Sequence, residues 1–190
     1  RKGLLGGARG VAGVAPGARI VALDVFRKEG VDQYAYVSDV LKAIDWVIAN
    51  KTAYNIVAIN LSVGGDQYTA PCNSDVFATP ATNARSAGIL TAAAAGNETV
   101  KNALGSPACV PAVVSVGAVY SANFGAEYWS SCTDATTQAD QVVCFSNSAS
   151  FLTLLAPGAE ITAAGYTYSG TSQATPHVAG AIAVLRAAYP

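Results

Sequence analysis

Short apolar runs alternate with amphipathic segments along most of the chain. Residues 18–26, 55–63, 89–96 and 112–119 are short and rich in valine, isoleucine, leucine and alanine, and residues 151–158 contain a further run of this kind. Short apolar runs between turn residues are typical of buried strands. We therefore predict five strands with little exposed surface.

Three helices are predicted from the remaining patterns. The first covers residues 37–50, where a polar face of Asp39, Lys42 and Asp45 lies opposite a regular apolar face. That apolar face consists of Val37, Val40, Leu41, Ile44, Val47 and Ile48. The second helix covers residues 76–88, with Pro80 in or just before its first turn and Gly88 at its end. The third begins near Thr171 and is apolar on all sides, which predicts a buried helix.

The order of these elements predicts the fold class. Strands that alternate with helices are typical of a parallel sheet covered by helices on its faces, which is a three-layer α/β/α fold. Functional groups in such folds gather beyond the carboxyl ends of the strands. Residues 121–147 are rich in polar side chains and are predicted to form a long surface loop. Residues 1–190 contain no internal repeat and fit one domain.

Composition excludes several classes of function. The net charge is −1, so the chain has no basic excess with which to bind nucleic acid. Its apolar runs are too short for a membrane span, so no membrane partner is expected. The four cysteines have no CxxC spacing and no histidine nearby, which argues against a zinc site. Their even number favours two disulfides and an oxidising compartment, with four buried free thiols as the alternative.

A serine at the start of the last predicted helix is the strongest candidate for chemistry. Ser172 lies in GTSQA, which lacks the second glycine of the GxSxG nucleophile elbow. The glycine-rich residues 3–17 precede a predicted strand instead of following one, so they do not fit a dinucleotide site. Taken alone, Ser172 could simply cap the helix. Unpaired backbone N–H groups at that position would also stabilise an anion.

The segment GTSQATPHVAG resembles the nucleophile segment of the subtilisin-like serine proteases, the subtilases, except that Gln173 stands where methionine is usual. Further segments match the same family in the same order. These are GVAGVAPGARIVALDVF, INLSVGG, TAAAAGN, GSPACVPAVVSVGAV and FSNSASFLTLLAPGAEI. Together they cover almost the whole chain.

The resemblance implies a role for several residues. Ser172 would be the nucleophile, and Asn97 would donate its side-chain amide to the oxyanion beside the backbone N–H of Ser172. Ser62, Val63 and Gly64 would bind the substrate backbone as an added strand. The pocket for the side chain before the scissile bond would be lined by uncharged residues, which favours apolar or aromatic side chains there. These residues are Ala94, Ala95, Gly96 and Gly105. As isolated residues, the glycines could equally be turn residues and Asn97 a loop cap.

The catalytic base is missing from the sequence. His177 is the only histidine, but a residue five positions after a helix N-terminus points away from it, so we expect a structural hydrogen bond there. The HGTHVAG-like and DTG-like segments of the family do not occur, and Asp24 belongs to a different segment. We therefore expect either an N-terminally truncated subtilase catalytic domain or a non-catalytic peptide-binding module that kept the scaffold. The truncated protease is the favoured interpretation.

The remaining expectations concern cross-links, ions and location. Cys132 and Cys144 flank one loop, and Cys72 and Cys109 follow strands that end at the site, so these pairs are predicted among three pairings. The resemblance also implies a cis peptide before Pro107 and a secreted protease that is monomeric when complete. Calcium is frequent in the family, but no acidic cluster marks a site, and no cofactor is predicted.

Overall fold

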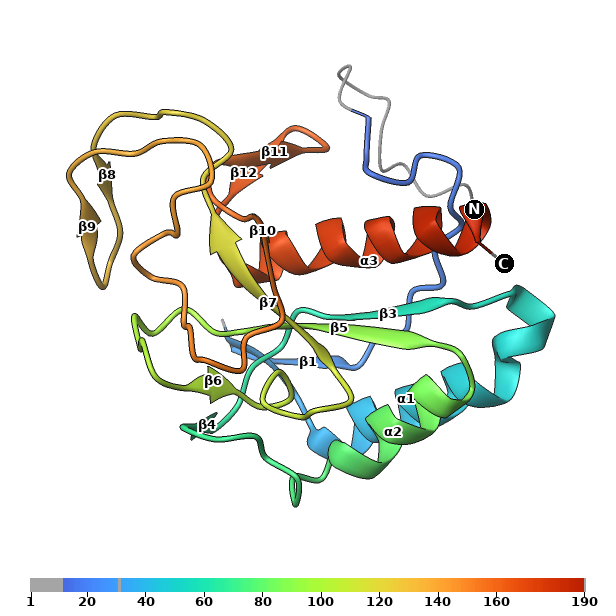
Figure 1. The fold of residues 1–190 in the computed structure, drawn as a ribbon. Coiled ribbons are helices and arrows are strands. Elements are labelled where there is room, and N and C mark those ends of the chain that lie inside the picture. The colour runs from blue at the N-terminus through green and yellow to red at the C-terminus, as the bar shows by residue number, and fades with distance from the viewer. Residues whose placement is uncertain (1–11, 31, 190) are drawn as a thin grey trace.

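A parallel sheet of four strands forms the centre of the molecule (Figure 1). The computed structural model describes residues 12–30 and 32–189. The strands are β3 (Ala58–Leu61), β5 (Leu90–Ala94), β7 (Val114–Val119) and β10 (Leu154–Pro157), in the spatial order β10-β7-β5-β3. In the register of the sheet, Ala92 of β5 lies opposite Asn60 on one side and Val114 on the other.

Helices cover both faces of this sheet. The helices α1 (Val37–Tyr54) and α2 (Ala78–Ser86) lie on one face, and α3 (Thr171–Ala188) crosses the other (Figure 1). This arrangement confirms the predicted three-layer α/β/α fold. Pro80 lies in the first turn of α2, as expected, and Gly88 follows the helix with a φ of 79°, a left-handed conformation that favours glycine.

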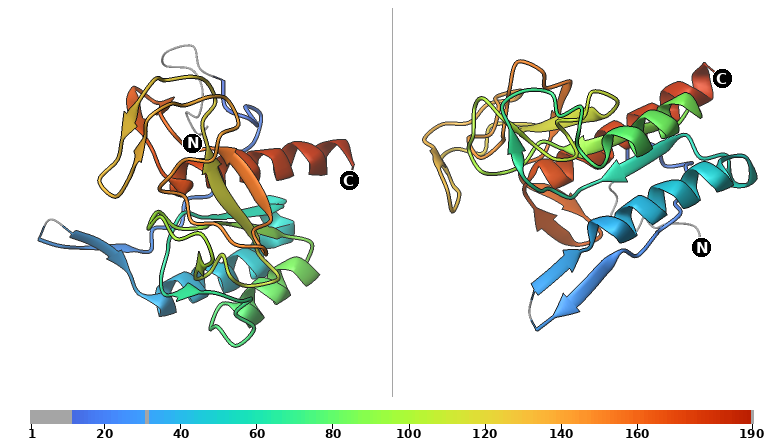
Figure 2. Two further views of the ribbon diagram at one scale, coloured as in Figure 1. Left: turned by 60° about the vertical axis from the view of Figure 1, so that its left-hand side comes forward. Right: turned by 90° about the horizontal axis from the view of Figure 1, so that it is seen from below.

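Within the described residues, four short antiparallel strand pairs surround the central sheet. They are β1 (Phe26–Glu29) with β2 (Asp32–Ala35), β4 (Gln67–Tyr68) with β6 (Leu104–Gly105), β8 (Glu127–Tyr128) with β9 (Thr133–Asp134), and β11 (Ile161–Ala163) with β12 (Tyr166–Tyr168). The pair β1–β2 projects away from the three layers (Figure 2).

Each face of the sheet has its own apolar core. Val40, Ile44 and Val47 of α1 and Ala81 and Ala84 of α2 pack against the first face. The second core contains Ala174 and Val178 of α3 together with Ala92, Val116 and Ala118 of the sheet. Alanine side chains are short, so α3 can pack close to the backbone of the sheet. Burial of these apolar side chains is the main favourable contribution to folding.

The strand predicted at residues 18–26 is wrong. Residues 18–25 have no regular structure, and β1 begins only at Phe26. Leu23 and Val25 pack against the first core, but Ile20 remains 49% exposed. The physical reason is the lack of a pairing partner, because the central sheet ends at β3 and residues 18–25 form no ladder with it.

Two predictions about burial also need correction. The segment 121–147 is more than a surface loop, because it contains β8 and β9 and buries Thr137, Val143 and Phe145. The last helix is buried only in its first half, and Leu185 is 59% exposed. Val14 meets α3 at Gly180 and Ile182 packs against the second core, whereas residues 184–189 are exposed.

The cross-links agree with the sequence. Cys72 is bonded to Cys109 and Cys132 to Cys144, which confirms both predicted pairs. The peptide bond between Ser106 and Pro107 is cis, as the family resemblance implied. Among the helices of the described residues, none has the length and apolar character needed to cross a lipid bilayer.

Two of the three valines of α1 provide a matched test of the first core. Val40 is 4% exposed and Val37 is 48% exposed. Val40→Ala should lower the free energy of unfolding by about 1.5–3 kcal/mol, because it removes two buried methyl groups and leaves a cavity. Val37→Ala should change it by less than about 0.5 kcal/mol. Denaturant unfolding measures both values, and equal losses would contradict the assigned packing.

Removal of each disulfide should have a different cost. The Cys72–Cys109 bond joins residues 37 positions apart and the Cys132–Cys144 bond residues 12 apart. Loop-closure entropy predicts contributions of about 4 and about 3 kcal/mol respectively. The Cys72→Ser/Cys109→Ser variant should therefore unfold at a lower denaturant concentration than Cys132→Ser/Cys144→Ser, and the reverse order would show that chain entropy does not control these bonds.

Candidate active site

Ser172 lies in the first turn of α3, at the edge of the second core. It is the second residue of the helix, and its side chain is half-buried. The backbone N–H groups of its neighbours are occupied: Thr171 donates to Asn97 Oδ1 at 2.8 Å and Gln173 to the Gly170 carbonyl at 3.0 Å. Within residues 12–30 and 32–189 the N–H of Ser172 has no acceptor. It is therefore a free donor at the positive end of the helix dipole.

Asn97 follows β5 and is held by Thr171. Its Oδ1 accepts two hydrogen bonds, from the backbone N–H of Thr171 at 2.8 Å and from Thr171 Oγ1 at 3.0 Å. These bonds fix Oδ1. Because the amide group is planar, they also fix the position of Nδ2, its other polar atom. In the part of the chain that the structure describes, this Nδ2 makes no hydrogen bond. Asn97 and Ser172 therefore offer two free donors from segments that Thr171 joins.

The residues predicted to bind the substrate backbone follow β3, which is an edge strand of the sheet. Ser62 Oγ accepts from Asn60 Nδ2 at 3.1 Å and donates to the Ser172 carbonyl at 2.9 Å. This bond ties the end of β3 to the start of α3. Gly64 is exposed and has open space where a Cβ would lie. An extended peptide could therefore pair with this edge.

The predicted pocket residues come together as well. Ala95 continues the line of β5 through a bond from its N–H to the Val116 carbonyl at 2.9 Å. Its own carbonyl accepts from the Gly105 N–H at 2.9 Å, so the end of β5 lies beside β6. Ala94, Ala95 and Gly105 are buried and Gly96 is half-buried. None of these four residues carries a charge, but the Glu98 carboxylate lies close to Gly96.

The single histidine does not contact Ser172. His177 Nδ1 is 2.8 Å from the Gln173 carbonyl, one turn earlier on α3, which confirms the predicted structural hydrogen bond. The Ser172 hydroxyl has no hydrogen-bond partner among the described residues, and so no base of this segment activates it.

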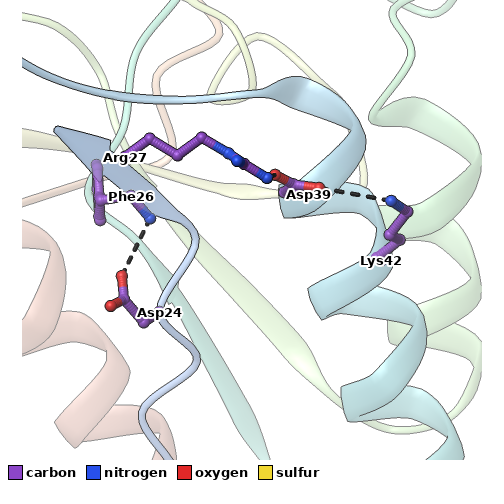
Figure 3. A network of polar contacts seen from close by, with 5 residues as sticks. All are labelled: Asp24, Phe26, Arg27, Asp39 and Lys42. Atoms are coloured by element: carbon purple, nitrogen blue, oxygen red, sulfur yellow. Dashed lines mark hydrogen bonds and ion pairs between the residues drawn. The ribbon is translucent and has the colours of Figure 1, made fainter. Parts of the chain in front are cut away.

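Asp24 belongs to a separate polar network on the side of β1 (Figure 3). Its carboxylate accepts from the Phe26 N–H at 3.1 Å. In the same network Arg27 pairs with Asp39 at 3.2 Å and Lys42 with Asp39 at 3.5 Å. The hydrogen bond from Arg27 lowers the pKa of Asp39. These exposed ion pairs contribute little stability and have no contact with Ser172.

One group of potential metal ligands occurs among the described residues, and it does not hold a metal. Asp75 lies close to Cys72 and Cys109. Because these two sulfur atoms are bonded to each other, they supply no thiolate ligands.

Several residues of the site were not singled out from the sequence. Thr171 is fully buried and fixes Asn97, although its place beside Ser172 was a usable signal. Lys101 follows the Asn97 segment in the chain and donates to the carbonyls of Cys144 at 2.8 Å and Ser146 at 2.7 Å. Desolvation lowers the pKa of this lysine. Nothing in the sequence pattern indicated that a charged residue would be used here.

The 120–147 segment is organised around Asp134. Its Oδ2 accepts from Tyr120 Oη at 2.8 Å and from the Cys144 N–H at 2.9 Å, and Trp129 Nε1 donates to Tyr120 Oη at 3.0 Å. Burial and the bond to Asp134 raise the pKa of Tyr120, so it stays a neutral donor. This network gives a defined shape to a segment that composition alone presented as a loop.

The Thr171 hydroxyl can be tested without any measurement of activity. It donates to Asn97 Oδ1 and accepts from the Gly96 N–H at 3.2 Å. Thr171→Val should lower the free energy of unfolding by about 1–3 kcal/mol, because it leaves both groups without this partner. Thr171→Ser keeps the hydroxyl and should cost about 1 kcal/mol or less. Equal losses in denaturant unfolding would show that the hydroxyl does not hold Asn97.

Comparison with known proteins relates almost the whole chain to one protein family. The family model for the Subtilase family matches residues 3–190. A subtilisin from Bacillus pumilus is 38% identical over 189 residues, which are 95% of this chain and 58% of the relative. Subtilisin E from Bacillus subtilis (strain 168) is also 38% identical over 189 residues, which are 42% of its length. This chain therefore spans about half the length of these relatives.

A solved structure supports the same assignment. The S41 psychrophilic protease superposes with a TM-score of 0.72 at 27% sequence identity, and the match covers 96% of this chain and 60% of the protease. A match of this extent takes in the parallel sheet and both helix layers. With its family match extending from residue 3 to residue 190, this chain belongs to the subtilase family.

Proposed function

We propose that this chain is the nucleophile-bearing part of a serine endopeptidase. The observation that carries the proposal is the pair of free donors, the Ser172 N–H and Asn97 Nδ2, which Thr171 holds at the end of β5. Donors fixed before the reaction stabilise an oxyanion in the transition state, and one such donor in a subtilisin contributes about 10²–10³ in kcat. Family membership supports the same reaction.

In the proposed reaction Ser172 Oγ attacks the carbonyl carbon of the scissile peptide bond. A base takes the hydroxyl proton, and the carbonyl oxygen becomes an oxyanion that accepts from the Ser172 N–H and from Asn97. The same base then protonates the departing amine, and water hydrolyses the acyl-enzyme. His177 is bonded to the Gln173 carbonyl, so we assign the base and its carboxylate partner to residues outside 1–190.

The substrate is proposed to be an extended peptide or protein segment. Its backbone would pair with residues 62–64 beside the edge strand β3. The side chain before the scissile bond would enter the uncharged pocket of Ala94, Ala95, Gly96 and Gly105, and so apolar or aromatic side chains are favoured.

The two disulfides support an extracellular location, because such bonds persist in oxidising compartments. We propose that the complete protease acts as a monomer on proteins or peptides. Acyl transfer through a serine needs no cofactor, and none is proposed.

A non-catalytic peptide-binding module is the second candidate. The unpaired Ser172 hydroxyl favours it, because a chain without a base could still hold a peptide along residues 62–64. The two candidates differ in whether the complete protein supplies a base for Ser172.

Activity in two forms of the protein distinguishes the candidates. Residues 1–190 alone should hydrolyse an unblocked peptide library negligibly, because nothing deprotonates Ser172. The same chain expressed with the coding sequence that precedes Arg1 should cleave peptides, and Ser172→Ala should abolish the cleavage.

His177→Ala serves as the control in the longer form and should retain kcat within about threefold, because the hydrogen bond of this side chain goes to a carbonyl of its own helix and not to Ser172. Cleavage by residues 1–190 that is lost in His177→Ala would overturn our assignment of the base. A longer form that binds peptides without cleaving them would establish the binding module instead.

A further inference from the structure

The segment that carries Asn97 is held by a second segment, residues 145–148, at the end of the 120–147 segment and before β10. Three backbone hydrogen bonds join the two segments. The Asn147 N–H donates to the Gly96 carbonyl at 3.0 Å, and the Ser148 N–H donates to the Val100 carbonyl at 2.9 Å. In the opposite direction, the Thr99 N–H donates to the Phe145 carbonyl at 3.0 Å. Asn97 therefore lies in a turn that is anchored on both sides.

The side chain of Asn147 fills this turn. It is 0% exposed, and Oδ1 accepts from the N–H groups of Glu98 at 3.1 Å and Val100 at 3.0 Å. Nδ2 donates to the Ala95 carbonyl at 3.3 Å and to Glu98 Oε2 at 2.6 Å. A side-chain amide has two donors and two acceptor positions, so all of its capacity is used on residues 95–100.

The backbone of the turn needs this support. Gly96 has a φ of 110° and Thr99 a φ of 65°, and a threonine in the left-handed region is strained. Such a conformation persists only where the surroundings fix it. Thr171 holds the side chain of Asn97, whereas Asn147 holds the backbone on both sides of it.

Asn147 also holds the charge next to the oxyanion donor. The Glu98 carboxylate is next to Asn97 in sequence and is bonded to Asn147 Nδ2. A carboxylate that moved freely there would oppose the negative charge of an oxyanion. The bond to Asn147 therefore fixes both the shape and the charge of this turn.

We propose that Asn147, through Glu98 and Val100, is a positioning residue for the oxyanion donor Asn97. Because it is fully buried, it acts on the substrate only through the turn. This inference rests on the proposed oxyanion role of Asn97. It predicts that changes at Asn147 alter kcat, which reports on the transition state, and leave KM nearly constant.

Asn147→Asp is the sharpest variant because the side chains have nearly the same size. The carboxylate still accepts from Glu98 and Val100 but loses both donor bonds and repels the Glu98 carboxylate. In the longer, active form described above, kcat should fall about 10- to 100-fold with KM within about threefold. Adding Glu98→Gln supplies a donor to the new carboxylate and should recover most of the loss.

A double-mutant cycle with Asn97→Ala separates positioning from general structural damage. If Asn147 acts through Asn97, adding Asn147→Asp to Asn97→Ala should lower kcat by no more than about twofold further. Losses that multiply in the double variant would overturn the inference. The matched control is Asn102→Asp, which places the same charge change on an exposed residue just beyond the turn and should leave kcat and KM unchanged.

Amide hydrogen exchange on residues 1–190 tests the inference independently of catalysis. Asn147→Ala should accelerate exchange at Glu98 and Val100 about tenfold or more relative to the amides of β5, because it removes their acceptor. Unchanged exchange would overturn the positioning role even if the chain is a binding module. An Asn97→Ala variant with full kcat would instead refute the proposed oxyanion donor, so the two failures are distinguishable.

Discussion

The hydrogen bonds from Thr171 to Asn97 Oδ1 join the carboxyl end of β5 to the first turn of α3, and the site depends on this junction. It needs a close approach of helix and sheet. Gly158 lies at the approach, where its N–H donates to the Val119 carbonyl and its own carbonyl accepts from the Gly170 N–H at 2.7 Å. A Cβ at this position would lie 2.6 Å from Ala118 Cβ, so a larger residue would displace the start of α3.

The order of the elements explains why the site forms at this end of the sheet. Parallel strands bring their carboxyl ends to one edge, and the segments after β3 and β5 meet α3 there. The helix supplies the unpaired N–H of Ser172, the turn after β5 supplies a side-chain amide, and the edge strand supplies backbone groups. None of these groups alone would distinguish a catalytic site from ordinary helix and strand ends.

Much of the architecture could be predicted from the sequence because periodicity reflects burial. Val40, Ile44 and Val47 on the apolar face of α1 and the alanine-rich run of β5 are buried as their patterns indicate. Val37, predicted on the same face, is instead 48% exposed. The strand expected near Ile20 was wrong because periodicity reports apolar character but says nothing of the neighbour with which a strand must pair. The exposed end of α3, including Leu185, has the same cause.

The site was predicted in part. The motifs around Asn97 and Ser172 indicated the candidate residues, and the structure places them beside a shared threonine. Asn147 was not identified, because its role depends on four contacts with a segment about fifty positions earlier. Contacts of this kind leave no local pattern in a single sequence. The assignment of the nucleophile itself remains a prediction.

The most direct test of that assignment is the position of a covalent adduct. A serine-directed fluorophosphonate should be incubated with the longer form of the protein, and the labelled peptide sequenced by mass spectrometry. We expect one phosphonyl group per molecule on Ser172, because only an activated and accessible hydroxyl reacts stoichiometrically. A catalytically active form whose adduct lies on another residue, or which resists the reagent, would contradict the account.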